Sequence, residues 1–276
     1  MMNRMTRAGL CLVMSLFATV AMAPKQTDLH EPFDKILDMY VRDGFVCYLA
    51  LKKSRGPLDR YVASLDIPRK TIESWTKPDQ QAFWINGYNA LVLRTVIDGY
   101  PITARSQTYP AKSIRQIPGA FETTKHRIGG ESFTLDEIEN GPIAAFGDPR
   151  MLLALGRGAL GSGRLKSEVY RGADIDKQLN EAVKECASRV NCFKIDESQK
   201  VVRVSPLFSW REKVFAQSPA PGDKWANRSP LERAVVSMVF PYLFQGEQQF
   251  LTANEWKMQF GTFDWRLNDL TGGVPE

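Results

Sequence analysis

The sequence predicts an α+β fold that is mainly helical, with short antiparallel hairpins. Long segments carry apolar residues at helical spacing and end at helix-stop signals, two segments open with capping boxes, and the strand-like segments are short and fold back locally. The 276 residues are 43% hydrophobic and 24% charged, the proportions of an ordinary globular protein. Because neither a repeat nor a low-complexity linker interrupts the chain, we expect one domain over residues 24–276.

The N-terminal segment, residues 1–23, has the composition of a secretory signal peptide. A basic head with Arg4 and Arg7 precedes an apolar run, and the segment closes on small residues at Ala21 and Ala23. The apolar run is too short to span a membrane. We therefore expect an exported protein, periplasmic or extracellular, without a stable membrane span after cleavage.

Charge argues against nucleic acid as a partner. Without Arg4 and Arg7, the 34 remaining Lys and Arg residues exceed the 31 Asp and Glu residues by three, and both signs are mixed along the chain. A nucleic-acid-binding domain would show a stronger and more localised basic excess. A metal or cofactor is not expected either, because His30 and His126 are the only histidines and no Cys/His cluster accompanies them.

Individual elements follow from local signals. Residues 77–98 have helical periodicity, and Gly99 with Pro101 ends the helix. Residues 174–190 form another amphipathic helix. Further helices are predicted to begin at two capping boxes, Thr134–Glu137 and Ser229–Glu232. Two segments are predicted to form hairpins, Arg127–Phe133 and Phe193–Val204.

Cysteines are few. Cys11 lies in the leader, and Cys47 lies in an apolar segment typical of a core. Cys186 and Cys192 stand six residues apart between a predicted helix and a predicted strand, a spacing that can close a small disulfide loop in an oxidising compartment. Two unpaired buried thiols are the alternative.

The most unusual segment has four glycines within residues 156–163, directly after an apolar run. Such a backbone must turn tightly or approach another group closely. Gly156–Gly161 formally matches a dinucleotide-binding fingerprint, with Asp176 at the later acidic position, but Gly163 interrupts the helix that should open there and no parallel strand precedes Asp176. A nucleotide site is therefore not expected.

Arg150, Arg157 and Arg164 punctuate this segment at equal spacing. Guanidinium groups beside exposed backbone amides can bind a carboxylate, phosphate or sulfate. The alternative is that these arginines pair with acids such as Glu139 and Asp148 and fasten a loop.

Two further groups of residues are candidates for the same site. Ser162, between two glycines, could act as a nucleophile with His126 as its base, although the glycine that a nucleophile elbow requires is replaced by Leu160. Asn86 and Asn89 place amides within an otherwise apolar helix, where they either clamp neighbouring backbone or contact a ligand.

Five segments together resemble the domain of unknown function family 547 in order and spacing. They are Phe83–Ala90, Thr134–Glu139, Asp148–Arg150, Val204–Trp210 and Phe263–Asn268. The resemblance as a whole runs from about Phe33 to Asn268. It implies no agreed reaction. Members of the family occur as exported bacterial proteins and as C-terminal parts of plant proteins.

The chain departs from the family pattern where chemistry would be sought. Typical members carry His where Leu152 stands, a further His where Asn140 stands, and cysteines where Arg157 and Ser162 stand. Thiol catalysis is therefore not expected here. The chain is interpreted either as a catalytically inactive relative or as one whose pocket has been rebuilt for an anion.

The sequence favours a protein that binds a small anionic or polar ligand at the glycine/arginine segment, and it leans away from an enzyme. In this hypothesis Arg150, Arg157 and Arg164 form the anion site, Asn86 and Asn89 fix the loop backbone, and Glu139 orients an arginine. A serine hydrolase using Ser162 with His126 and a protein-interaction module remain the alternatives.

Overall fold

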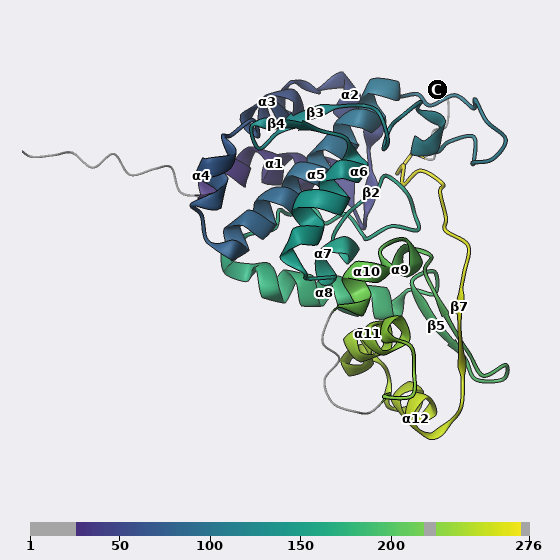
Figure 1. Cartoon of the computed structure of the whole chain (residues 1–276). Coiled ribbons are helices and arrows are strands. Elements are labelled where there is room, and N and C mark those ends of the chain that lie inside the picture. The colour runs from purple at the N-terminus through teal and green to yellow at the C-terminus, as the bar shows by residue number, and fades with distance from the viewer. Residues whose placement is uncertain (1–25, 218–224, 272–276) are drawn as a thin grey trace, which may run out of the picture.

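The part of the chain that the structure describes is mostly helical, as the sequence predicts, and contains three small sheets (Figure 1). The computed structural model describes residues 26–217 and 225–271, so the predicted signal peptide, residues 1–23, lies outside the described residues. Helices α1 to α7 occupy one part of the molecule, and α9 to α12 with the strands β5 to β7 occupy the other (Figure 1). Helix α8 lies between these two parts and contacts both α5 and α11.

The helices have the following bounds: α1 Gln26–Tyr40, α2 Tyr48–Lys53, α3 Gly56–Ser64, α4 Arg69–Glu73, α5 Lys77–Gly99, α6 Leu135–Ile138, α7 Arg150–Leu153, α8 Ile175–Ser188, α9 Leu207–Trp210, α10 Glu212–Ala216, α11 Pro230–Val239 and α12 Gln245–Ala253. The strands are β1 Val41–Arg42, β2 Phe45–Val46, β3 His126–Ile128, β4 Glu131–Phe133, β5 Phe193–Asp196, β6 Val201–Val204 and β7 Lys257–Phe260. Short 3-10 turns and one π turn connect them: η1 Ile114–Gln116, η2 Glu139–Ile143, η3 Ala144–Phe146, η4 Gly172–Asp174 and η5 Phe240–Tyr242.

Helix α5 is the centre of the core. It begins where the Thr76 side chain accepts a hydrogen bond from the Asp79 backbone and ends at Gly99, as predicted. Every residue from Gln81 to Leu93 is buried, because α1, α2, α3 and α8 all pack against it. A helix surrounded on all sides buries its polar side chains as well, so each of them must find a hydrogen-bond partner inside the protein.

The other local predictions are confirmed. Both capping boxes form, at the starts of α6 and α11. The predicted hairpins are β3 with β4 and β5 with β6. The sequence did not indicate β7, which pairs in parallel with β6 and makes the third sheet mixed.

Cys186 and Cys192 form the predicted disulfide, which joins the end of α8 to the start of β5. Both residues are buried. Cys47 is the free thiol of the described residues and is half-buried at the start of α2, so it is less enclosed than the apolar segment predicts.

The segment after β7 returns to the helical part of the molecule. It runs from the lower strands back to β2 (Figure 1). Val46 donates to the Asn268 carbonyl at 2.8 Å, and Leu270 donates to the Val46 carbonyl at 2.9 Å. Residues 264–268 lie beside the glycine-rich segment, because Leu160 and Gly161 donate to the carbonyls of Arg266 and Asp264.

Candidate functional site

The glycine-rich segment is held on both sides by backbone contacts. Leu160 and Gly161 donate to the carbonyl oxygens of Arg266 and Asp264, each at 2.9 Å. A Cβ atom on Gly163 would stand 2.0 Å from the Leu153 carbonyl oxygen, and such a close contact permits no side chain. The glycines therefore serve close packing of the backbone.

The two asparagines of α5 hold backbone on the inner side of the same region. The Asn89 side chain accepts a hydrogen bond from the Gly156 backbone at 2.8 Å and donates to the Ala154 carbonyl at 3.2 Å. Asn86 makes the equivalent pair of bonds with the Tyr170 backbone, at 2.9 and 2.8 Å. Both side chains are buried, and each amide forms hydrogen bonds through its oxygen and its nitrogen with backbone groups that would otherwise be unsatisfied.

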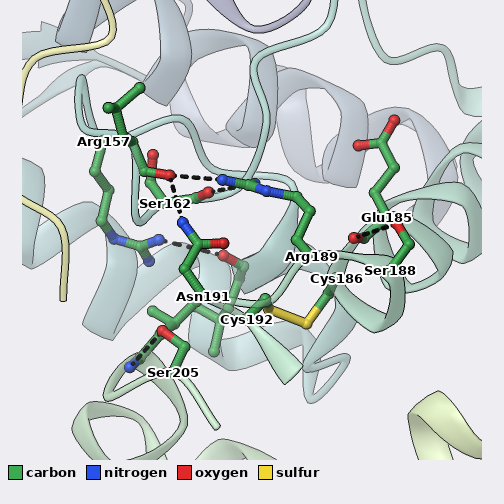
Figure 2. The surroundings of a disulfide bond; sticks show 12 residues. Arg157, Ser162, Glu185, Cys186, Ser188, Arg189, Asn191, Cys192 and Ser205 are labelled. Carbon is green, nitrogen blue, oxygen red and sulfur yellow. Dashed lines mark hydrogen bonds between the residues drawn. A yellow bond between two sulfur atoms is a disulfide. The ribbon is translucent and has the colours of Figure 1, made fainter. Parts of the chain in front are cut away.

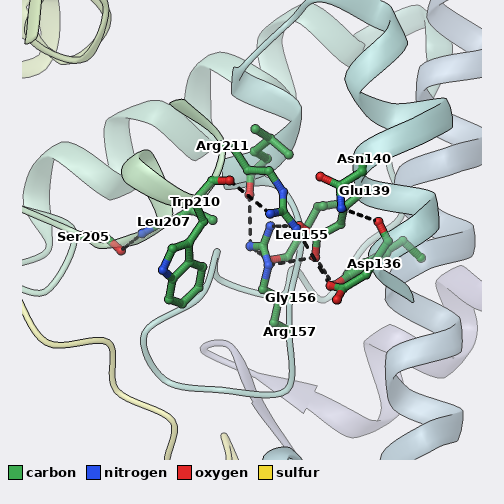
Figure 3. Close-up of polar contacts among 12 residues, drawn as sticks. Asp136, Glu139, Asn140, Leu155, Gly156, Arg157, Ser205, Leu207, Trp210 and Arg211 are labelled. Atoms are coloured by element: carbon green, nitrogen blue, oxygen red, sulfur yellow. Dashed lines mark hydrogen bonds and ion pairs between the residues drawn. The ribbon is translucent and has the colours of Figure 1, made fainter. Parts of the chain in front are cut away.

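Arg157 belongs to a buried ion network (Figure 3). Its Nε and Nη2 atoms donate to the Glu139 carboxylate at 2.9 and 2.7 Å, and Arg211 Nη2 donates to the same carboxylate at 2.9 Å. The Tyr88 hydroxyl donates to it as well. Arg157 is 2% exposed and Glu139 is 1% exposed.

Electrostatics keep this network charged. Burial alone raises the pKa of Glu139, but the guanidinium groups of Arg157 and Arg211 outweigh it and hold the pKa below its ordinary value. Glu139 therefore remains a carboxylate that fastens π turn η2 to the glycine-rich segment. Because Arg157 is buried and paired, its geometry does not suit the expected role as an anion ligand.

The other two arginines of the segment differ from each other. Arg150 is held by Asp148 at 2.8 Å, by Asp176 at 2.7 Å and by Asn180 at 2.8 Å, which fastens α7 to α8. Arg164 pairs with Asp43 and is about one-third exposed. Of the six residues expected to bind ligand, only Arg164 lines a cleft that the structure shows beside the segment.

This cleft has a volume of about 360 Å³ and lies between the glycine-rich segment, β2 and the segment after β7. Its charged walls carry three arginines, Arg164, Arg189 and Arg266, and two acids, Asp43 and Asp264. Asp43 pairs with Arg164, and Asp264 pairs with Arg266 at 2.6 Å. One positive charge, that of Arg189, is left over.

Arg189 lies in the middle of the loop that the Cys186–Cys192 disulfide closes, and its side chain is held by two hydrogen bonds (Figure 2). Its Nη1 atom donates to the Ser162 carbonyl at 2.9 Å and its Nη2 atom donates to the Leu160 carbonyl at 2.6 Å. Among the residues that the structure describes, no carboxylate lies within ion-pair distance of it. Burial lowers the pKa of Arg189; Glu185 opposes this shift, and the positive charge of Arg164 adds to it.

The proposed serine–histidine pair is not joined in the structure. Ser162 is 4% exposed, and its hydroxyl donates to the Ala159 carbonyl at 2.5 Å, with the Gly163 carbonyl also near at 3.3 Å. His126 Nε2 on β3 is buried and has no hydrogen-bond partner among the residues that the structure describes. Burial, aided by Arg94, lowers the pKa of His126 to about 4. With its hydroxyl turned onto carbonyls, Ser162 acts as a turn residue.

Residues 26–217 and 225–271 contain no group of three or more His, Cys, Asp and Glu side chains placed to hold a metal ion. Over the same ranges, no helix is long and apolar enough to cross a membrane.

Sequence reasoning missed Arg189 and Arg266, which supply two of the three guanidinium groups of the cleft. A signal for Arg189 was present, because the residue stands inside the predicted disulfide loop between Cys186 and Cys192. No signal could have placed Arg266 there, since only the return of the chain after β7 brings it to the glycine-rich segment.

Comparison with known families identifies one domain. The family model DUF547, described as "Protein of unknown function, DUF547", matches residues 72–185. This range covers α5, the π turn and the glycine-rich segment, but not the motifs at 204–210 and 263–268. Neither a curated protein nor a solved structure matches the chain.

Proposed function

We propose that this chain, which carries a DUF547 domain over residues 72–185, binds a small anion in the cleft beside its glycine-rich segment. The observation that carries the proposal is the Arg189 guanidinium, which faces the cleft without a carboxylate partner among the described residues. A guanidinium held in fixed geometry binds phosphate, sulfate or carboxylate through charge-assisted hydrogen bonds. The anion would supply the missing negative charge.

The arrangement of the cleft supports a small ligand. About 360 Å³ lies at the lower end of the range of small-molecule sites. Arg164 and Arg266 stand in the same walls and pair with Asp43 and Asp264, so the cleft keeps one net positive charge, which suits a ligand of low charge. Asn191, which also lines the cleft, donates to the Leu160 carbonyl at 3.2 Å and helps to fix that wall.

Calorimetric titration with inorganic phosphate, at constant ionic strength, tests the proposal. Arg189→Gln removes the charge, and we expect a loss of affinity of about 10- to 150-fold, since a hydrogen bond to a charged group contributes about 1.5–3 kcal/mol. Arg127→Gln is the matched control, because Arg127 pairs with Asp66 on the exposed face of β3. Failure of the native protein to bind phosphate saturably, or equal affinity in Arg189→Gln, would overturn the proposal.

We also propose that the protein is exported. Residues 1–23 have the pattern of a signal peptide, and a disulfide such as Cys186–Cys192 persists in oxidising compartments. N-terminal sequencing of the protein recovered outside the cytoplasm should begin near residue 24. Recovery of the intact chain from the cytoplasm alone would contradict this.

A further inference from the structure

We infer that the Cys186–Cys192 disulfide positions Arg189 for anion binding, so that the affinity of the cleft depends on the redox state of this bond. The inference rests on the proposed function and concerns the regulation of the same site. The disulfide itself touches no ligand. It acts through the loop that presents the guanidinium to the cleft.

The backbone of the loop turns around Arg189. Helix α8 ends at Ser188, and the Arg189 backbone N–H donates to the Cys186 carbonyl at 3.2 Å. The Arg189 carbonyl in turn accepts hydrogen bonds from Cys192 at 2.8 Å and Phe193 at 2.9 Å. Arg189 thus lies at the turn that the disulfide closes, with a cysteine three residues away on each side.

The side chains of the loop reach across to the glycine-rich segment. Arg189 donates to the carbonyls of Leu160 and Ser162, and Asn191 donates to the same Leu160 carbonyl (Figure 2). The disulfide lies close behind these contacts, because a space of only about 10 Å³ is bounded by Cys186, Cys192, Arg189 and the glycines 161 and 163. On this side the loop packs directly against the glycine-rich segment.

The physical effect of the bond is to remove alternative loop conformations. An arginine has many rotamers, and ordering such a side chain on binding costs about the equivalent of a two- to tenfold change in affinity. A loop closed by a disulfide orders the backbone of Arg189 before the anion arrives. An open loop would have to be ordered by the anion itself.

Reduction needs a dithiol, such as dithiothreitol or a thioredoxin-like protein. One thiolate of the dithiol attacks a sulfur of the Cys186–Cys192 bond and forms a mixed disulfide, and its second thiolate then releases the protein cysteine. The protein gains two electrons and two protons as two thiols, and the dithiol becomes a disulfide. Because both cysteines are buried, reduction requires local opening of the loop.

The test is a cycle of four proteins titrated with inorganic phosphate: the native protein, Cys186→Ser with Cys192→Ser, Arg189→Gln, and the triple variant. Loss of the disulfide should weaken phosphate binding roughly two- to tenfold when Arg189 is present. It should have little further effect when Arg189 is replaced by Gln, because the charged side chain that the disulfide positions for the anion is then absent. If the disulfide only stabilised the fold, its loss would weaken phosphate binding equally in the presence and in the absence of Arg189.

Two controls separate positioning from stability. Leu179→Ala removes a buried side chain of α8 and should lower the melting temperature while leaving phosphate affinity unchanged well below it. Native protein reduced with dithiothreitol, with alkylation of both cysteines verified by peptide mass spectrometry, gives the same comparison without substitution. Unchanged affinity after loss of the bond, or an equal loss in the Arg189→Gln background, would overturn the inference alone. Absence of phosphate binding by the native protein would overturn the proposed function together with it.

Discussion

Replacement of Glu139 by Gln tests the buried ion network most severely. The substitution keeps the shape of the side chain and removes its charge. Glu139 accepts three guanidinium hydrogen bonds, two from Arg157 and one from Arg211, at 2.7 to 2.9 Å. A glutamine would offer one oxygen and turn an N–H₂ group toward a guanidinium, so Arg157, 2% exposed, would be left as an uncompensated buried charge.

Breaking a buried ion pair on one side costs about 3–5 kcal/mol in the free energy of unfolding. In a domain of this size, each kcal/mol of lost stability lowers the melting temperature by about 2–4 °C, so we expect the melting temperature to fall by roughly 6–20 °C. Urea unfolding gives the free energy directly and calorimetry gives the melting temperature. The control is Asp136→Asn, since Asp136 lies 3.9 Å from Arg211, is 38% exposed and should cost under about 1 kcal/mol.

The pH dependence of the same variant follows from the lowered pKa of Glu139. A carboxyl whose pKa is depressed in the folded state stabilises the protein fully above its unfolded pKa, and this stabilisation is lost as the pH falls through the folded value. The difference between native protein and Glu139→Gln should therefore be largest at neutral pH and shrink in acid. A loss below about 1 kcal/mol at neutral pH would refute the view that this network holds the glycine-rich segment.

Two further predictions concern other parts of the fold. Gly163→Ala would press a methyl group against the Leu153 carbonyl and should destabilise the protein by about 1–3 kcal/mol or prevent folding. Gly141→Ala is the control, because the space around Gly141 is open and the melting temperature should change little. Equal effects of the two substitutions on the melting temperature would contradict the packing argument. His30 is buried, and this burial, with the charge of Arg171, lowers its pKa to about 3. The unfolded chain therefore binds a proton more readily than the folded one, and the stability should fall as the pH drops from about 6.5 toward 3. His30→Asn should flatten that part of the pH profile, measured by thermal unfolding. An unchanged slope in the variant would be inconsistent with a buried neutral imidazole.

The sequence predicts those parts of the fold that depend on neighbouring residues. A capping box needs only Thr134 and Glu137, and a hairpin needs only a turn between two short strands, so both are recognised within a few residues. The pairing of β7 with β6 joins residues more than 50 positions apart, and no local signal specifies it. The disulfide was predictable because its two cysteines are close in sequence.

The candidate site was predictable only in part, for the same reason. The glycines and arginines of residues 150–164 identify the correct segment, but partners distant in sequence determine what each arginine does. Arg157 pairs with Glu139, 18 residues earlier in the chain, and the same carboxylate also pairs with Arg211, so Arg157 is part of a buried structural network. Arg189 becomes the available cation because it directly follows α8, which ends beside the segment. Spacing along the sequence cannot distinguish these two outcomes.

The central claim is that the cleft binds an anion through Arg189 while Arg157 stays within its ion network. Its most direct test is the arginine side-chain Nε–H spectrum, recorded by nuclear magnetic resonance during titration with inorganic phosphate. The resonance of Arg189 should shift saturably, Arg164 and Arg266 should shift less, and Arg157 should not move. A saturable shift at Arg157 without one at Arg189, or no shift at any of these arginines, would contradict the claim.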